Sequence, residues 1–149
     1  MNVNSPNYEK NRLFLFLGLS LLGTSVLAQS KTRTKQHRIV FHLATGDTLA
    51  YRALTKQLSN VLAYWPTALL EVVVHNKGIG FMRRDQSVFE PEIQALKSKG
   101  VVFAVCENTM KQQKLTKDQI LSQAVFVPVG LAELVIRQEE GWSYIKAGF

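Results

Sequence analysis

The chain has 149 residues, of which 46% are hydrophobic and 19% are charged, a balance typical of a folded globular domain rather than a disordered chain. Its net charge of +7 comes from basic residues that are scattered and not interleaved with aromatic residues, which argues against a nucleic-acid-binding surface. The single cysteine, Cys106, excludes an internal disulfide, and no His or Cys spacing typical of a metal site is present.

The first 28 residues have the layout of a secretory signal peptide. Lys10 and Arg12 supply the positive start, an apolar run follows, and Val26-Leu27-Ala28 is a small-residue cleavage pattern. An uncleaved membrane anchor is the alternative, but a spanning helix needs roughly 20 apolar residues and polar residues dilute the second half of this run. We therefore expect an exported protein, periplasmic or secreted, that meets the membrane only if this segment stays uncleaved.

Cleavage after Ala28 would leave 121 of the 149 residues, which is enough for one domain with a core of its own. Residues 29–36 are polar and basic, and we expect them to form a flexible leader. The domain is then predicted over residues 37–149.

Hydrophobic patterning predicts alternating strands and helices in this domain. Short β-branched and apolar runs predict strands at 38–43, 69–74, 101–105, 124–127 and, as an exposed edge strand, 142–146. Apolar residues at helical spacing predict helices at 48–64, 88–99, 115–123 and 129–140, with shorter turns or helices at 81–84 and 107–114. Strands that are apolar throughout favour parallel pairing with both faces covered. The prediction is a three-layer α/β/α domain with a mostly parallel sheet of about five strands.

Ligands of open parallel sheets bind outside the carboxyl ends of the strands, so the loops at that edge hold the candidate site residues. Those residues are Thr45, Gly46, His75, Asn76, Gly78, Cys106, Asn108, Thr109 and Pro128. Cys106 is the strongest nucleophile among them, because backbone N–H groups after a strand can lower a thiol pKa. A buried packing cysteine explains its position equally well.

The remaining polar candidates have simpler explanations. His75 can act as a base or orient a ligand, although a satisfied polar residue at a strand end is the favoured interpretation. His42 is expected to pack on one face of the sheet, and Asp47 to cap a helix. Gly78-Ile79-Gly80 is a weak match to a dinucleotide-binding fingerprint, because Arg83 stands where the third glycine would be.

Four segments together resemble the DsrE/DsrF-like family of sulfur-relay proteins, especially its uncharacterised single-domain branch. They are the loop Val74–Met82, the strand and loop Gly100–Thr109, the segment Phe126–Leu134 and the terminal Gly141–Ile145, and their order and spacing follow the family pattern.

The resemblance implies that Cys106 accepts sulfane sulfur as a persulfide and passes it on. It also implies a homo-oligomer (a dimer, trimer or hexamer), a sulfur donor or acceptor protein as partner, and no cofactor. His75, Asn76 and Asn108 would line the pocket, with Asn108 able to donate to the sulfur. The alternative is a non-catalytic module of the same fold that binds a small ligand or builds an oligomer, and the sequence leaves open whether the protein is an enzyme.

Overall fold

The computed structural model describes residues 36–148, so the predicted signal peptide and all but the last residue of the predicted leader lie outside the described residues. The strands are β1 (Arg38–Leu43), β2 (Leu69–Val74), β3 (Val102–Cys106), β4 (Ala124–Val127) and β5 (Ser143–Ala147). The α-helices are α1 (Thr48–Tyr64), α2 (Glu90–Ser98), α3 (Glu107–Gln112) and α4 (Gly130–Glu139), and the 3-10 helices are η1 (Asn76–Met82) and η2 (Lys117–Gln119).

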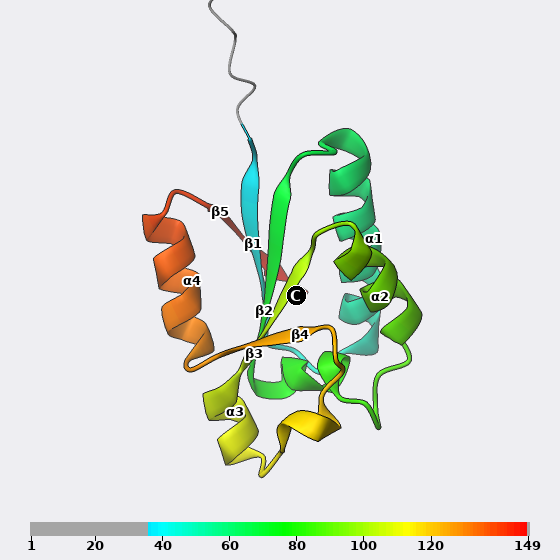
Figure 1. The fold of residues 1–149 in the computed structure, drawn as a ribbon, viewed down its shortest axis with the longest axis vertical. Helices are drawn as coiled ribbons and strands as arrows, with labels where there is room; N and C mark the ends of the chain where they lie inside the picture. Colours follow the sequence, from blue (N-terminus) through cyan, green and yellow to red (C-terminus); the bar gives the residue numbers. More distant parts are fainter. Residues whose placement is uncertain (1–35, 149) are drawn as a thin grey trace, which may run out of the picture. The chain divides into compact units, whose positions relative to one another are not determined.

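The described strands form one parallel sheet in the order β4-β3-β2-β1-β5, and helices cover both of its faces (Figure 1). In Figure 1, α1 and α2 lie on one side of the sheet, α4 lies on the other, and α3 lies beyond the carboxyl end of β3. This is the predicted three-layer α/β/α architecture. Within residues 36–148, no helix combines the length and the apolar character that crossing a membrane requires.

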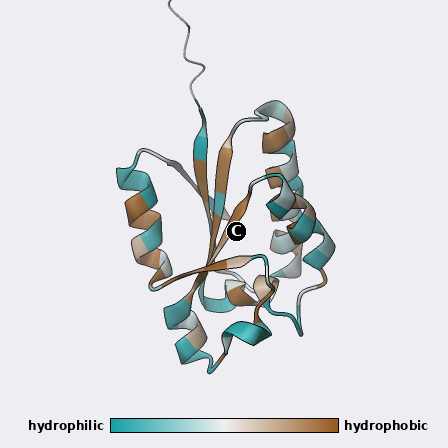
Figure 2. Ribbon diagram, viewed as in Figure 1, coloured by the Kyte–Doolittle hydropathy of each residue, from teal (hydrophilic) through white to brown (hydrophobic). Residues whose placement is uncertain are grey.

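The two faces of the sheet are packed unequally. The α1 and α2 face holds most of the buried apolar side chains, including the aromatic rings of Phe41, Phe81 and Phe103. The α4 face holds a much smaller cluster, in which Leu134 of α4 packs against small and β-branched residues of the central strands. Figure 2 shows apolar residues on α4 as well as along the central strands. A helix packed through so few side chains leaves the carboxyl edge of this face accessible.

Local sequence signals explain where the elements begin. The Asp47 side chain accepts a hydrogen bond of 2.8 Å from the Leu49 N–H, so the predicted cap starts α1 at Thr48. Pro91 lies in the first turn of α2, where its missing N–H costs nothing.

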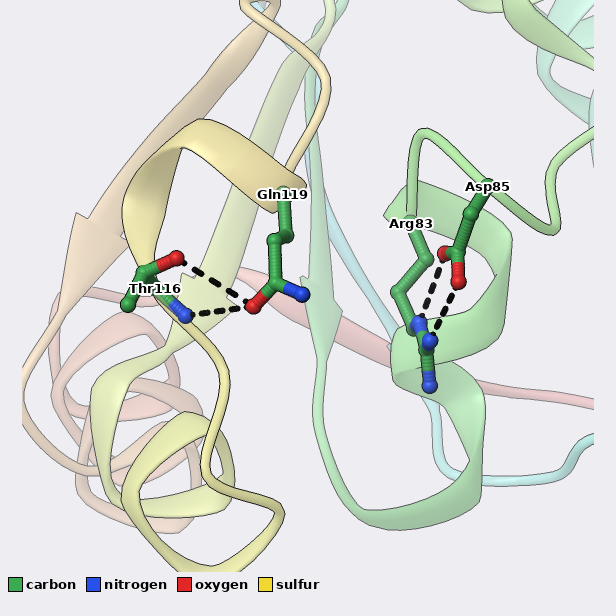
Figure 3. A network of polar contacts seen from close by, with 4 residues as sticks. All are labelled: Arg83, Asp85, Thr116 and Gln119. Atoms are coloured by element: carbon green, nitrogen blue, oxygen red, sulfur yellow. Dashed lines mark hydrogen bonds and ion pairs between the residues drawn. The ribbon is translucent and has the colours of Figure 1, made fainter.

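The prediction of a helix at 115–123 is wrong, because only the short 3-10 helix η2 forms there. The Gln119 side-chain oxygen closes this turn by accepting from both the backbone N–H and the hydroxyl of Thr116 (Figure 3). The carbonyl of Ile120 then accepts from the Arg84 guanidinium instead of from a helical N–H. The Leu121 N–H donates to the Met82 carbonyl at 2.9 Å. Because the segment after η1 satisfies these backbone groups, the chain stays extended and buries its apolar side chains.

The same neighbouring segment is ordered by its own ion pair. Figure 3 shows Arg83, just after η1, holding Asp85 through two side-chain contacts. Arg83 also forms an antiparallel bridge with Ile120, which ties this turn to the extended segment. The helical turn predicted at 81–84 therefore forms only in part: its first two residues are the end of the 3-10 helix η1, which runs from Asn76 to Met82.

A buried ion pair joins α4 to the central strand of the sheet. Glu71 of β2 is 1% exposed, and its Oε2 lies 2.7 Å from the Nε of Arg137. Arg137 also contacts Glu133 and Glu140 of its own helix, and its guanidinium lies over the Trp142 ring. Burial raises the pKa of Glu71 to about 7, although the charge of Arg137 opposes this shift.

We expect Glu71→Gln to change how stability depends on pH. The pKa of Glu71 rises from 4.5 to about 7 on folding. Its contribution to stability is therefore complete below pH 4.5 and is lost as pH rises through 7. Glutamine does not ionise, so the variant does not lose this contribution. As pH rises from 5 to 8, the unfolding free energy of the variant should therefore increase relative to that of the wild type by roughly 1–3 kcal/mol. Urea unfolding at several pH values measures the difference, with the exposed Glu92→Gln as control. A difference that does not vary with pH contradicts this account.

Candidate functional site

Strand register brings one cysteine and two histidines to the carboxyl edge of the α4 face. Val74 pairs with Val105, so His75 and Cys106 follow side by side at the ends of β2 and β3. Side chains two residues apart share a face of a sheet, which places both residues on the face of Val73 and Ala104. His42 pairs with Val73 across β1 and β2 and lies on that face too.

The Cys106 sulfur is surrounded by hydrogen-bond donors. Its Sγ accepts the N–H of Gly130, the first residue of α4, at 3.2 Å and the N–H of Thr109 at 3.4 Å. Cys106 is also the cap of α3, so the helix begins on the sulfur rather than on a hydroxyl or carboxylate. The cysteine itself is only 4% exposed.

Two opposing effects set the acidity of this thiol. Burial raises the pKa of Cys106, because it disfavours the charged thiolate. The backbone N–H groups of Gly130 and Thr109 donate to the sulfur and favour the thiolate, and the nearby Thr109 hydroxyl acts in the same direction. Together the hydrogen bonds outweigh burial and lower the pKa below its ordinary value.

Gly130 is required for this arrangement because the first turn of α4 touches the sheet. A Cβ at position 130 would lie 3.2 Å from the Cβ of Cys106 and 3.3 Å from the Cβ of His75. It would also lie 3.3 Å from a methyl group of Val73. Any larger residue would press on these neighbours, so glycine lets the Gly130 N–H reach the sulfur without displacing them. The same distances place the Cβ atoms of Cys106 and His75 around one point.

The two histidines at this edge are joined directly. The Nε2 atoms of His42 and His75 are 2.5 Å apart, and the ring planes differ by 13°. The ring centroids are 4.7 Å apart, and the nitrogen–nitrogen gap and the two ring radii account for this separation. The imidazoles therefore meet edge to edge, nitrogen to nitrogen. On its other side, the Nδ1 of His42 lies 2.7 Å from the hydroxyl of Tyr144 on β5.

Both imidazoles favour the neutral form. Burial, followed by the positive charges of His75 and Lys146, lowers the pKa of His42, and burial lowers the pKa of His75. Two facing nitrogens can also hold a metal ion, but residues 36–148 contain no group of three His, Cys, Asp or Glu residues placed to bind one. The pair is therefore best described as a proton-sharing contact.

Several predicted site residues hold the loops in place. The Asn76 N–H donates to the Thr109 hydroxyl oxygen at 3.0 Å, and the Asn76 carbonyl accepts from Gln113. Asn76 has a positive φ of 52°, a conformation that asparagine tolerates better than most residues. A Cβ at Gly78 would lie 2.3 Å from the Leu43 carbonyl oxygen, so Gly78 permits close packing of η1 against β1.

Other predicted residues lie elsewhere or act through the backbone. The Asn108 N–H donates to the Pro128 carbonyl at 3.1 Å, which joins the β3 and β4 ends. The Thr45 hydroxyl accepts from the Asp47 N–H at the start of α1. Gly46 lines a hollow of about 230 Å³ together with Tyr51 and Lys77. This hollow lies by loops of the same carboxyl edge, but none of Cys106, His75 and His42 lines it.

A larger hollow of about 350 Å³ lies between α1 and α2, and it is also separate from the cysteine. Arg52, Lys56 and Lys99 contribute positive charge to its rim, and Glu92 contributes negative charge. Its size therefore does not identify it as the reactive site, which is defined by the contacts to the sulfur.

Sequence reasoning missed three residues of the site: Gly130, His42 and Tyr144. His42 was expected only to pack on a sheet face, and it does lie on one, but beside a second histidine. The signal that could have found it is the parallel register of β1 and β2, which brings their carboxyl ends together. Gly130 and Tyr144 depend on where α4 and β5 dock, which the local sequence does not encode.

The whole region resembles known proteins. The family model described as the DsrE/DsrF-like family matches residues 37–147. Among solved structures, a protein of unknown function, MTH1491 from Methanobacterium thermoautotrophicum, is 32% identical to the chain with a TM-score of 0.72. That match covers 74% of this chain and 99% of the other. No curated protein matches the sequence.

We expect Thr109→Val to raise the pKa of the Cys106 thiol, because the variant removes a hydroxyl that favours the thiolate. The rate of alkylation at pH 7 should fall roughly tenfold, the usual scale for one hydrogen bond to a charged group. Thr109→Ser should restore the rate, and the buried Thr55→Val serves as a matched control. Rates followed from pH 5 to 10 give the pKa, and an unchanged profile in Thr109→Val would show that the hydroxyl does not favour the thiolate.

Proposed function

The chain belongs to the DsrE/DsrF-like family, whose members are generally related to sulfur relay, and we propose that it carries sulfane sulfur as a persulfide on Cys106. The observation that carries the proposal is the ring of donors around the sulfur, led by the N–H groups of Gly130 and Thr109. A buried packing cysteine needs no such donors. A thiolate nucleophile does need them.

The proposed reaction is redox-neutral. The Cys106 thiolate attacks the outer sulfur of a donor persulfide, R–S–SH, and a new S–S bond forms on Cys106. The S–S bond of the donor breaks, and its electron pair leaves with the inner sulfur as R–S⁻, which is then protonated. One cysteine is sufficient, because the carrier returns its sulfur to an acceptor thiol by the same exchange. No cofactor takes part in either step.

The burial of Cys106 supports the alternative, a module of the same fold in which the cysteine packs and no sulfur is moved. At 4% exposure, a bulky reagent cannot reach the sulfur unless the loops part. The two functions therefore differ in a measurable way. A carrier reacts with a small persulfide despite its burial, and a packing cysteine remains unmodified.

We expect the mature protein to gain the mass of one sulfur atom when it is treated with a small persulfide and freed of excess donor. Cys106→Ser should gain nothing, because the chain has no other cysteine. Intact-mass spectrometry in the folded state measures the gain, and a thiol reductant should reverse it. A wild-type chain that stays unmodified, yet reacts after unfolding, would favour the packing module.

We also propose that the protein is exported and acts in the periplasm or outside the cell, after cleavage behind Ala28. The support is the charged, apolar and small-residue order of residues 10–28. Intact masses of protein recovered from the periplasm read out the cleavage directly. A full-length chain that remains in the cytoplasm would contradict it.

We propose, third, that the chain associates with copies of itself through the outer side of α4. Leu131, Val135 and Ile136 are 58%, 52% and 45% exposed on this helix, while Leu134 faces the sheet. Val125 on the edge strand β4 adds a further exposed apolar side chain. Leu131, Val135 and Ile136 thus form an exposed apolar ridge on α4. Such a ridge is unusual on a helix whose inner face is already buried.

We expect Val135→Asp to lower the oligomeric state, because a charge on the ridge must be desolvated when two copies meet. Light scattering after size-exclusion chromatography gives the molar mass of each variant. Leu49→Asp, which replaces an apolar residue 69% exposed on α1, is the matched control and should leave the mass unchanged. A wild-type chain that is already monomeric at high concentration would refute the assembly.

A further inference from the structure

The His42–His75 contact can bind one extra proton but not two. Hydrogen bonding between the two Nε2 atoms needs one nitrogen to donate and the other to accept. One added proton makes one ring an imidazolium that still donates to its neutral partner. A second added proton would place two N–H groups against each other at 2.5 Å. The pair is therefore built to take up and release a single proton.

This pair lies between the protein surface and the end of β3. Tyr144 is 42% exposed on β5, an edge strand of the sheet. Its hydroxyl contacts the Nδ1 of His42. His42 contacts His75, and the Cβ atoms of His75 and Cys106 both lie close to Gly130. Cys106, His75, His42 and Tyr144 thus come from the neighbouring strands β3, β2, β1 and β5 in turn.

Sulfur transfer moves one proton, and the reaction must place it somewhere. The Cys106 thiol loses a proton before it attacks, and the leaving thiolate R–S⁻ gains one afterwards. Over the whole exchange a thiol and a persulfide become a persulfide and a thiol, so the proton only changes place. A base that holds it briefly, and then acts as an acid, lowers both barriers.

We propose that the His42–His75 pair is the acid–base unit of sulfur transfer at Cys106, taking the thiol proton and returning it to the leaving thiolate. This inference rests on the persulfide-carrier function proposed above. His75 is the member nearer the sulfur, and His42 sets its tautomer and shares its proton. Tyr144 in turn orients His42.

The charges around His42 and His75 favour a short-lived imidazolium, which takes up a proton and releases it again. Lys146 of β5 lies across from His42 and disfavours a lasting imidazolium, and burial acts in the same direction on both rings. Glu133 on the first turn of α4 is engaged by Arg137 rather than by the histidines. An imidazolium formed here is a stronger acid than an exposed one and is better able to protonate a thiolate.

The test compares donors whose leaving thiols differ in basicity. A persulfide of an aromatic thiol leaves as a stable thiolate and needs little acid assistance, whereas a persulfide of an alkyl thiol needs much more. His75→Gln should slow sulfur uptake from the alkyl donor by roughly 10²-fold and from the aromatic donor by only a few-fold. His42→Gln should shift the ratio of the two rates in the same direction.

The controls distinguish the acid–base proposal from the persulfide-carrier proposal on which it rests. His37→Gln removes a histidine that stacks on Trp65 at the opposite end of β1, and it should leave both rates unchanged. If His75→Gln slows both donors equally, the effect is structural and the acid–base role is overturned while the carrier survives. If the folded wild type takes sulfur from neither donor, the carrier function itself fails.

Discussion

The contact between Glu71 and Arg137 fixes α4 on a face of the sheet where apolar packing is sparse. Leu134 is the main buried apolar side chain that α4 contributes, so hydrophobic burial alone specifies the helix position weakly. The Glu71–Arg137 contact of 2.7 Å joins a central strand to the last turn of α4, and it specifies where the helix lies on the sheet. Arg137 keeps Glu133 and Glu140 as partners if Glu71 is removed, whereas Glu71 without Arg137 is a buried carboxyl without its ion-pair partner. Since the pKa of Glu71 is about 7, the pair fixes the helix position more than it stabilises the fold.

That position determines the chemistry at the other end of the helix. With Arg137 held at the sheet, the first turn of α4 comes down at the ends of β2 and β3, and Gly130 fits between His75 and Cys106. The Gly130 N–H then points at the sulfur and helps to lower the thiol pKa against the effect of burial. The lowered pKa of the Cys106 thiol thus depends on an ion pair near the opposite end of α4 and on a glycine that permits contact.

Much of this arrangement could be predicted from the sequence, because it depends on local patterns. Apolar runs located the strands, and the Asp47 cap located the start of α1. The parallel sheet then placed Cys106 and His75 at one edge. The missing helix at 115–123 shows where local patterns stop: Leu121 bonds to Met82, a partner far away in the chain. Tyr144 and Gly130 were missed for the same reason, since docking of β5 and α4 creates their contacts.

The two sides of α4 would connect Cys106 to the proposed assembly. Gly130 faces Cys106, and its neighbour Leu131 opens the exposed apolar ridge on the outer side. A second copy bound on that ridge would therefore lie within one residue of the group that stabilises the thiolate. Such a copy would restrict bulky reagents further and leave the exposed Tyr144 side of the sheet as the approach for a small donor. Under the proposed carrier function, burial of the sulfur would then select persulfide donors by size.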